Sequence, residues 1–186
     1  MEFFPQIELG WLNGWIVLVL LGLADGICFL VFPTDVVKRL WDRSGWSPKQ
    51  VVLTVLAKLC ALVCLALLVL TPLKLGTPLF WIGLAVTALG LAGVVAALLD
   101  FRYTPFDQPV ARGLYRISRH PQTVMALTVL LGGAIAVGSW AVVLALAVAR
   151  VFGHFSIVAE EEVCSKRYGA SYREYMRRVP RYFLFF

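Results

Sequence analysis

Five apolar blocks dominate the chain, and each is long enough to cross a bilayer. They fall at residues 11–32, 50–70, 79–99, 121–137 and 141–159. About 20 predominantly apolar residues are enough for a transmembrane helix. Hydrophobic residues make up 60% of the sequence and charged residues 15%, whereas soluble domains carry about 45–50% and about 25%. The sequence therefore predicts an all-α, polytopic membrane protein with about five transmembrane helices.

A short amphipathic tail follows the fifth block. Gly169 is typical of the residue that ends a helix, and Ser171 with Glu174 fits the S-x-x-E capping box that opens a new one. We accordingly expect an N-terminal three-span region at residues 1–100. A C-terminal region at residues 101–186 would hold a polar loop, a two-span hairpin and the tail.

The basic residues between the blocks fall almost entirely on one side. Fourteen Lys and Arg lie in the first-to-second loop, the third-to-fourth loop and the tail, and the opposite side carries only Lys74. Because cytoplasmic loops are enriched in Lys and Arg, we expect a cell-membrane protein with its N-terminus outside and its C-terminus in the cytoplasm. This orientation also accounts for the net charge of +6, so no nucleic-acid partner is expected.

Arg119, His120 and Pro121 stand at the entrance of the fourth block. Proline is favoured at the first position of a helix, so the fourth helix is expected to begin there. The free N–H groups of a helix N-terminus bind carboxylates and phosphates. Two interpretations stay open: the charges only mark the cytoplasmic side, or they hold a polar ligand at the mouth of the helix.

Three carboxylates, Glu160, Glu161 and Glu162, end the fifth block, where cations are normally preferred. At 3.6 residues per turn, Arg150, His154 and Glu161 share one face of this helix. Ionisable residues inside spans typically face the bundle interior or a cavity. The face is therefore either part of a site or an internal Arg150–Glu pair that only stabilises packing.

The last eighty residues carry an ordered set of short motifs: GLYRISRHP at 113–121, EE at 160–161, YG at 168–169 and YREYMRRVPR at 172–181. This set resembles the C-terminal signature of the integral membrane methyltransferases, which include isoprenylcysteine carboxyl methyltransferases and phosphatidylethanolamine N-methyltransferases. The chain departs from the signature in two places: Thr123 stands where a tyrosine is expected, and no proline follows a few residues after VPR. The matching residues are Gly113, Tyr115, Arg119, His120, Pro121, Glu160, Glu161, Tyr168, Gly169, Tyr172, Tyr175, Val179, Pro180 and Arg181.

The resemblance implies a methyltransferase that uses S-adenosylmethionine (AdoMet) and releases S-adenosylhomocysteine. The donor would lie in a pocket made by the last two spans, the loop before them and the tail, which makes residues 101–186 the cofactor-binding region. The implied partner is a lipid or another lipophilic acceptor, a phospholipid amine or an isoprenylcysteine-type carboxylate. The cofactor-binding residues would be Tyr115, Arg119, His120, Pro121, Glu160, Glu161, Tyr168, Tyr172 and Arg181, and the catalytic residues Arg150, His154 and Glu161.

Within this set, Arg119, His120 and the helix N-terminus suit the donor carboxylate, and Glu160 and Glu161 suit its ammonium or ribose diol. The tyrosines suit its adenine or sulfonium, which aromatic faces attract. The four cysteines complete no metal set with the histidines, so no metal is expected.

Two other functions stay open. Some sterol reductases share a similar C-terminal arrangement, so an NADPH-dependent membrane reductase is one alternative, although such enzymes have more spans. The other is a small non-enzymatic carrier, in which Asp25, Lys58 and Arg150 would line the path of an ion or substrate. Otherwise these three residues would form an interhelical charge pair.

The charge asymmetry predicts the orientation of the chain. A cysteine placed beside Lys74, in a variant without the native cysteines, should react with an impermeant maleimide in intact cells. A cysteine in the tail should react only after the cells are permeabilised. Labelling of both positions from outside would contradict the five-span topology.

Overall fold

The computed structural model describes residues 1–3, 5–42 and 46–183, and its regular elements are all helical. The predicted all-α fold class is confirmed. The elements are α1 Trp15–Val31, α2 Thr34–Leu40, α3 Pro48–Leu70, α4 Pro78–Arg102, the 3-10 helix η1 Gly113–Arg116, α5 Pro121–Ala136, α6 Trp140–Tyr168 and α7 Ala170–Arg178.

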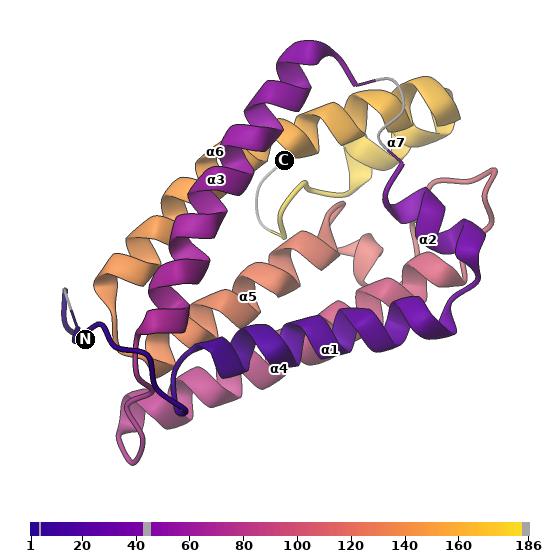
Figure 1. Ribbon diagram of the computed structural model, residues 1–186. Coiled ribbons are helices and arrows are strands. Elements are labelled where there is room, and N and C mark those ends of the chain that lie inside the picture. The colour runs from indigo at the N-terminus through magenta and orange to yellow at the C-terminus, as the bar shows by residue number, and fades with distance from the viewer. Residues whose placement is uncertain (4, 43–45, 184–186) are drawn as a thin grey trace.

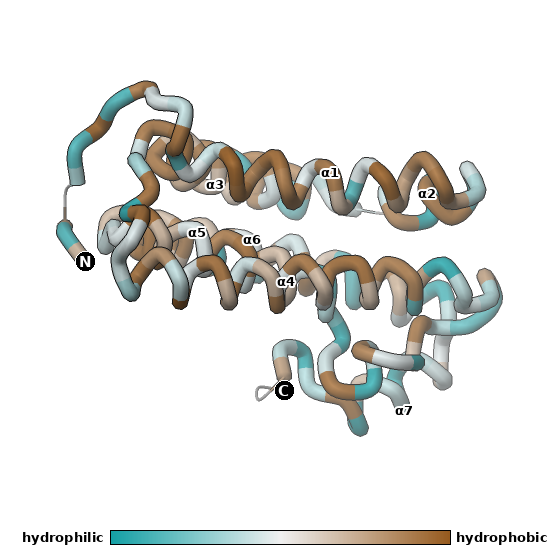
Figure 2. Tube along the Cα trace, turned by 90° about the horizontal axis from the view of Figure 1, so that it is seen from below, coloured by the Kyte–Doolittle hydropathy of each residue, from teal (hydrophilic) through white to brown (hydrophobic). Residues whose placement is uncertain are grey.

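The long helices converge at one end of the molecule and diverge at the other (Figure 1). Helix α3 runs beside α6, while α4 runs beside both α5 and α1. The diverging ends carry α2, α7 and the loop before α5. Figure 2 shows apolar residues along the long helices and most of the hydrophilic residues gathered around α2 and α7. The fold therefore places a polar assembly at the open end of an apolar bundle.

Three helices, α3, α4 and α6, are long and apolar enough to cross a membrane. Helices α1 and α5 are also apolar but shorter, with 17 and 16 residues. Helix α1 begins after the predicted start at residue 11. The buried Asn13 side chain instead donates to the carbonyls of Glu8 and Val69, which fixes this segment as a turn. The chain is a helical membrane protein.

Helices α4 and α5 are in backbone contact, and glycine makes this possible. A Cβ atom on Gly83 would lie 2.5 Å from the backbone nitrogen of Ala136 and from the carbonyl oxygen of Gly132, closer than real atoms approach. A Cβ atom on Gly90 would likewise lie 2.6 Å from the backbone nitrogen of Val129. Small residues are typical of helix contacts in lipid, where van der Waals packing drives association. Among the described residues, the α4–α5 pair forms the most extensive helix contact of the bundle.

The capping box predicted at Ser171 and Glu174 is wrong. The residue before α7 is Gly169, with φ +59°, and α7 has no side-chain cap. The Ser171 hydroxyl donates to the carbonyl of Tyr168, and Glu174 pairs with Arg178 instead. Gly169 does end α6, because a positive φ leaves the helical region.

The glycine contact predicts that Gly83→Leu separates α4 from α5. Overpacking of a close contact costs about 1–3 kcal/mol, so the melting temperature in detergent should fall. Gly22→Leu on α1 is the matched control, because a Cβ there meets nothing within 4 Å. Equal melting temperatures for the two variants would contradict the close contact.

Candidate functional site

One buried carboxylate, Glu161 on α6, lies at the centre of the polar assembly. Only 5% of the surface of Glu161 is exposed to solvent. Nε of Arg119 donates to it at 2.8 Å and Nη2 of Arg181 at 2.6 Å, and Nε2 of His120 lies 3.3 Å away. These partners come from the loop before α5 and from the tail. A single side chain therefore joins three segments that are far apart in the sequence.

Further hydrogen bonds hold the loop before α5 against the tail. The Arg119 side chain donates to the carbonyl of Val179, and its backbone N–H donates to the carbonyl of Pro180. The Ser118 hydroxyl donates to the carbonyl of Arg181 at 2.9 Å. The tail thus provides hydrogen-bond partners for buried polar groups of the loop. A buried polar group left without a partner would cost about 1–3 kcal/mol.

The turn at η1 brings Tyr115 to the inside of the assembly. Gly113 has φ +51°, and a Cβ there would collide with the Asp100 carboxylate, which accepts a hydrogen bond from the backbone N–H of Leu114. The Tyr175 hydroxyl donates to the carbonyl of Tyr115 at 2.7 Å. Burial raises the pKa of both tyrosines, so the two phenols stay neutral.

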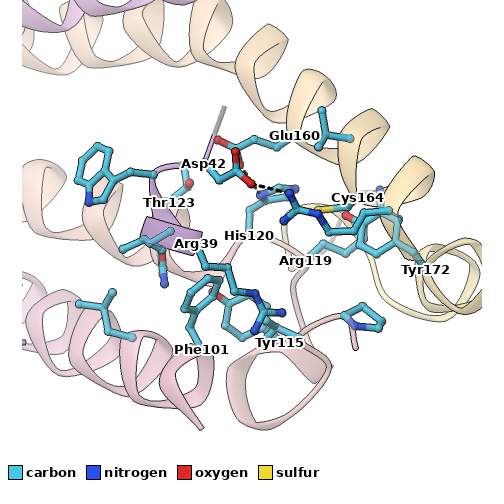
Figure 3. Close-up of a pocket in the computed structure, with 18 of the residues that line it drawn as sticks. Arg39, Asp42, Phe101, Tyr115, Arg119, His120, Thr123, Glu160, Cys164 and Tyr172 are labelled. Atoms are coloured by element: carbon cyan, nitrogen blue, oxygen red, sulfur yellow. Dashed lines mark hydrogen bonds and ion pairs between the residues drawn. The ribbon is translucent and has the colours of Figure 1, made fainter. Parts of the chain in front are cut away.

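A pocket of about 400 Å³ opens beside this cluster, between α1, α2, α4, α5, α6 and α7. In Figure 3 the side chains of Arg39, Tyr115, His120 and Glu160 approach it from different elements. The buried Nε2 of Gln122 also lies in its wall and has no hydrogen-bond partner in the described part of the chain. The predicted site residues that line the pocket are Tyr115, Arg119, His120, Glu160, Tyr168 and Tyr172.

The other predicted cofactor-binding residues lie behind the wall. Pro121 is fully buried as the first residue of α5. Glu161 contacts the lining residues Arg119 and His120 from outside the pocket, and Arg181 in turn pairs with Glu161. The hydrogen bond to Glu161 raises the pKa of Arg181, so its guanidinium stays charged. The structure therefore brings all nine predicted cofactor-binding residues into one assembly, of which six form the pocket surface.

Arg150 and His154 share a face with Glu161 but do not line the pocket. The guanidinium of Arg150 lies 4.3 Å from the ring centroid of Tyr182, and Nδ1 of His154 lies 2.9 Å from the Tyr182 hydroxyl. The predicted face thus meets the tail over more than two turns of α6. The catalytic role predicted for Arg150 and His154 stays a prediction. The charge pair left open for Asp25, Lys58 and Arg150 is not formed in the described residues.

Arg39 on α2 is a pocket residue that sequence reasoning missed. It donates to the carbonyls of Thr104, Pro105 and Gln108 and to the hydroxyl of Tyr168. Its guanidinium thereby fixes the loop after α4 against α6. In the sequence Arg39 is one of fourteen basic residues that fit the orientation rule, so nothing distinguishes it from a charge that only marks the cytoplasmic side.

Asp25 and Phe29 of α1, Phe101 of α4, and Gln122 and Thr123 of α5 also line the pocket. The first hundred residues therefore contribute to a wall that the sequence motifs place in residues 101–186. The motifs could not reveal this, because they all lie after residue 112, and the sequence assigns Asp25 a role only in the carrier alternative.

A family model described as phospholipid methyltransferase matches residues 73–171, just over half of the chain. The match runs from the turn before α4 to the start of α7. It includes the loop before α5 and Glu161, and excludes α1, α2 and Arg181. No curated protein and no solved structure matches the chain.

The buried cluster predicts that Glu161→Gln loosens the tail. The change leaves the guanidinium of Arg119, whose side chain is 5% exposed, without its counterion, and breaking a buried pair costs about 3–5 kcal/mol. We expect a lower melting temperature and faster tryptic cleavage at Arg177 and Arg178. The matched control is Glu174→Gln, which removes a pair with Arg178 that is about two-thirds exposed and should cost at most about 1 kcal/mol. A similar fall in melting temperature in both variants would contradict a central role for Glu161.

Proposed function

The chain belongs to the phospholipid methyltransferase family, and on this basis we propose that it transfers a methyl group from AdoMet to a lipophilic acceptor. The acceptor is a phospholipid amine or an isoprenylcysteine-type carboxylate. The observation that carries the proposal is the pocket of about 400 Å³, whose wall combines cations, a carboxylate and aromatic rings. The fourteen basic residues on one side support a cytoplasmic pocket in the cell membrane, with the N-terminus outside.

The polar side chains of the pocket wall fit the charged and polar groups of AdoMet. His120 and Arg119 stand at the N-terminus of α5, whose first N–H groups have no acceptor within the helix, and together they suit the AdoMet carboxylate. Glu160, whose side chain is 48% exposed, suits the ammonium or the ribose diol. The unpartnered Nε2 of Gln122 supports a ligand that accepts a hydrogen bond in the pocket.

The aromatic residues suit the remaining parts of AdoMet. Tyr115, Tyr168 and Tyr172 line one region of the wall, and the rings of Tyr168 and Tyr172 lie 6.5 Å apart. Such faces pack against adenine and attract a sulfonium. Burial raises the pKa of Tyr172, so it offers a neutral ring. Pro121, Glu161 and Arg181 act indirectly, by fixing the helix start and the orientation of Arg119 and His120.

Bound AdoMet would supply a methyl group that its sulfonium already activates. The protein would hold the donor and the acceptor in line and exclude water. Such positioning accounts for much of the rate in transfers of this kind. The cluster around Glu161 serves this purpose because it fixes the cationic wall from three segments. The apolar residues Phe29, Val94 and Leu98 supply a water-excluding wall from α1 and α4.

For Arg150 and His154 we propose a role through the tail. Both contact Tyr182, which directly follows Arg181, the partner of Glu161. Their contacts would keep Arg181 in register with Glu161 and so keep the cationic wall in place. A direct role in turnover would instead require these side chains to reach the acceptor.

The proposal predicts that AdoMet binds the purified protein and that His120→Ala weakens this binding. A charge-assisted contact contributes about 1.5–3 kcal/mol, so the dissociation constant should rise roughly ten- to a hundredfold by calorimetry in nanodiscs. The control is Arg116→Ala, which removes an exposed cation of the same loop outside the pocket and should bind normally.

The same titration separates the alternatives. Binding of NADPH and not of AdoMet would favour a reductase, and binding of neither would favour a carrier. Equal AdoMet affinity of the His120→Ala and Arg116→Ala variants would remove His120 from the donor site.

A further inference from the structure

Asp25 is an acidic side chain within α1, one of the apolar helices of the bundle. It is partly buried, and it lines the pocket one turn before Phe29 on the same helix. No other acidic or basic residue occurs between Trp15 and Val31. Carboxylates inside apolar helices of membrane proteins are rare and typically have a partner or a function.

The other charged side chains of the pocket have hydrogen bonds or ion pairs among the described residues. Arg39 donates to backbone carbonyls, Arg119 pairs with Glu161, His120 lies between Glu160 and Glu161, and Arg167 pairs with Asp42. Asp25 has neither a hydrogen bond nor an ion pair to any residue that the structure describes. Lys58 and Arg150, the basic residues within the spans, do not line the pocket. Among the charged groups of the pocket wall in the described residues, the one without a polar contact is therefore the Asp25 carboxylate.

The surroundings of Asp25 differ from those of the cationic wall. Phe29 of α1, Val94 and Leu98 of α4 and Ala126 of α5 line the pocket and pack in one apolar cluster. This region suits a lipophilic molecule. The polar lining residues come from other elements: Arg119 and His120 from the loop before α5, and the tyrosines from that loop and from α6 and α7. The pocket thus has a region that suits the donor and an apolar region with a single carboxylate.

We propose that Asp25 binds the amine of the methyl acceptor and takes a proton from it. This inference rests on the proposed function and narrows its acceptor to an amine. A lipophilic carboxylate would meet the charge of Asp25 unfavourably, whereas an ammonium supplies the counterion that Asp25 lacks. The lipophilic part of the acceptor lies against Phe29, Val94 and Leu98. The acceptor is therefore a lipid with a primary amine in its headgroup.

The reaction balances in charge and in electrons. The ammonium of the acceptor gives one proton to the Asp25 carboxylate, and the freed electron pair of the nitrogen attacks the methyl carbon. The new C–N bond forms as the C–S bond breaks, and sulfur keeps the electron pair and becomes neutral. The product is a methylated ammonium, and Asp25 releases its proton to water at the pocket mouth.

The test is methyl transfer by the Asp25→Asn variant in nanodiscs that contain phosphatidylethanolamine and tritiated AdoMet. Removal of a positioned base typically costs a factor of about a hundred or more, so kcat/KM for the lipid should fall by about that much. The dissociation constant for AdoMet should stay within about twofold of the wild-type value. The melting temperature should equal that of the wild type within experimental error. Asp25→Glu should restore part of the rate, which a purely structural role would not predict. Asp35→Asn on α2, an exposed carboxylate outside this pocket, is the matched control and should leave turnover unchanged.

Other acceptors separate the possible outcomes. Ethanolamine without acyl chains should be a poor substrate, and an S-farnesylated cysteine with a blocked amine should not be methylated. Wild-type turnover by Asp25→Asn, or methylation of the farnesylated carboxylate in preference to the lipid amine, would overturn the assignment. Loss of AdoMet binding in Asp25→Asn would move Asp25 to the donor site. If the wild type does not bind AdoMet at all, the proposed function fails, and this inference fails with it.

Discussion

The Glu161 carboxylate is the interaction on which the polar end of the molecule depends. It is buried and is shared by Arg119, His120 and Arg181, which come from the loop before α5 and from the tail. A buried charge is stable only while its partners stay in place, so the arrangement is cooperative. The loop before α5, the end of α6 and the tail are therefore ordered together. The wall that carries Arg119 and His120 is built from this joined arrangement.

The shape of the bundle follows from a different force. In lipid, apolar surface is not driven inward, so close backbone packing decides which helices meet. Gly83 and Gly132 let α4 and α5 approach closely, and α3 pairs with α6. The two groups meet near the N-terminus and diverge towards α2 and α7 (Figure 1). The pocket lies at this diverging end, where an apolar wall from the helices meets a polar wall from the loops.

The division of the pocket into these two walls gives the family chemistry a physical basis. The polar wall offers cations, a carboxylate and aromatic faces, and the residues behind it fix their positions. The apolar wall comes from α1 and α4 and contains one carboxylate, Asp25. The polar donor and the lipophilic acceptor that we propose would need such different surroundings, and this pocket offers both. The tail adds the last element, because Arg181 reaches Glu161 only when α7 folds back on α6.

The sequence by itself determined the helical membrane fold, the approximate positions of the five long apolar helices and the family. Apolar length, proline and glycine positions and the order of RHP, EE and VPR are local properties, and they are legible without a structure. It also placed Arg150, His154 and Glu161 on one helix face, since that depends only on helical periodicity. The capping box that the sequence predicted at Ser171 is wrong, because α7 begins directly after Gly169, whose φ is positive. Only the tertiary structure decided that Glu160 lines the pocket while Glu161 lies behind it, and that Arg39 and Asp25 join the wall. These assignments depend on contacts between segments tens of residues apart, where buried charges find their counterions, and no local pattern encodes such a pairing.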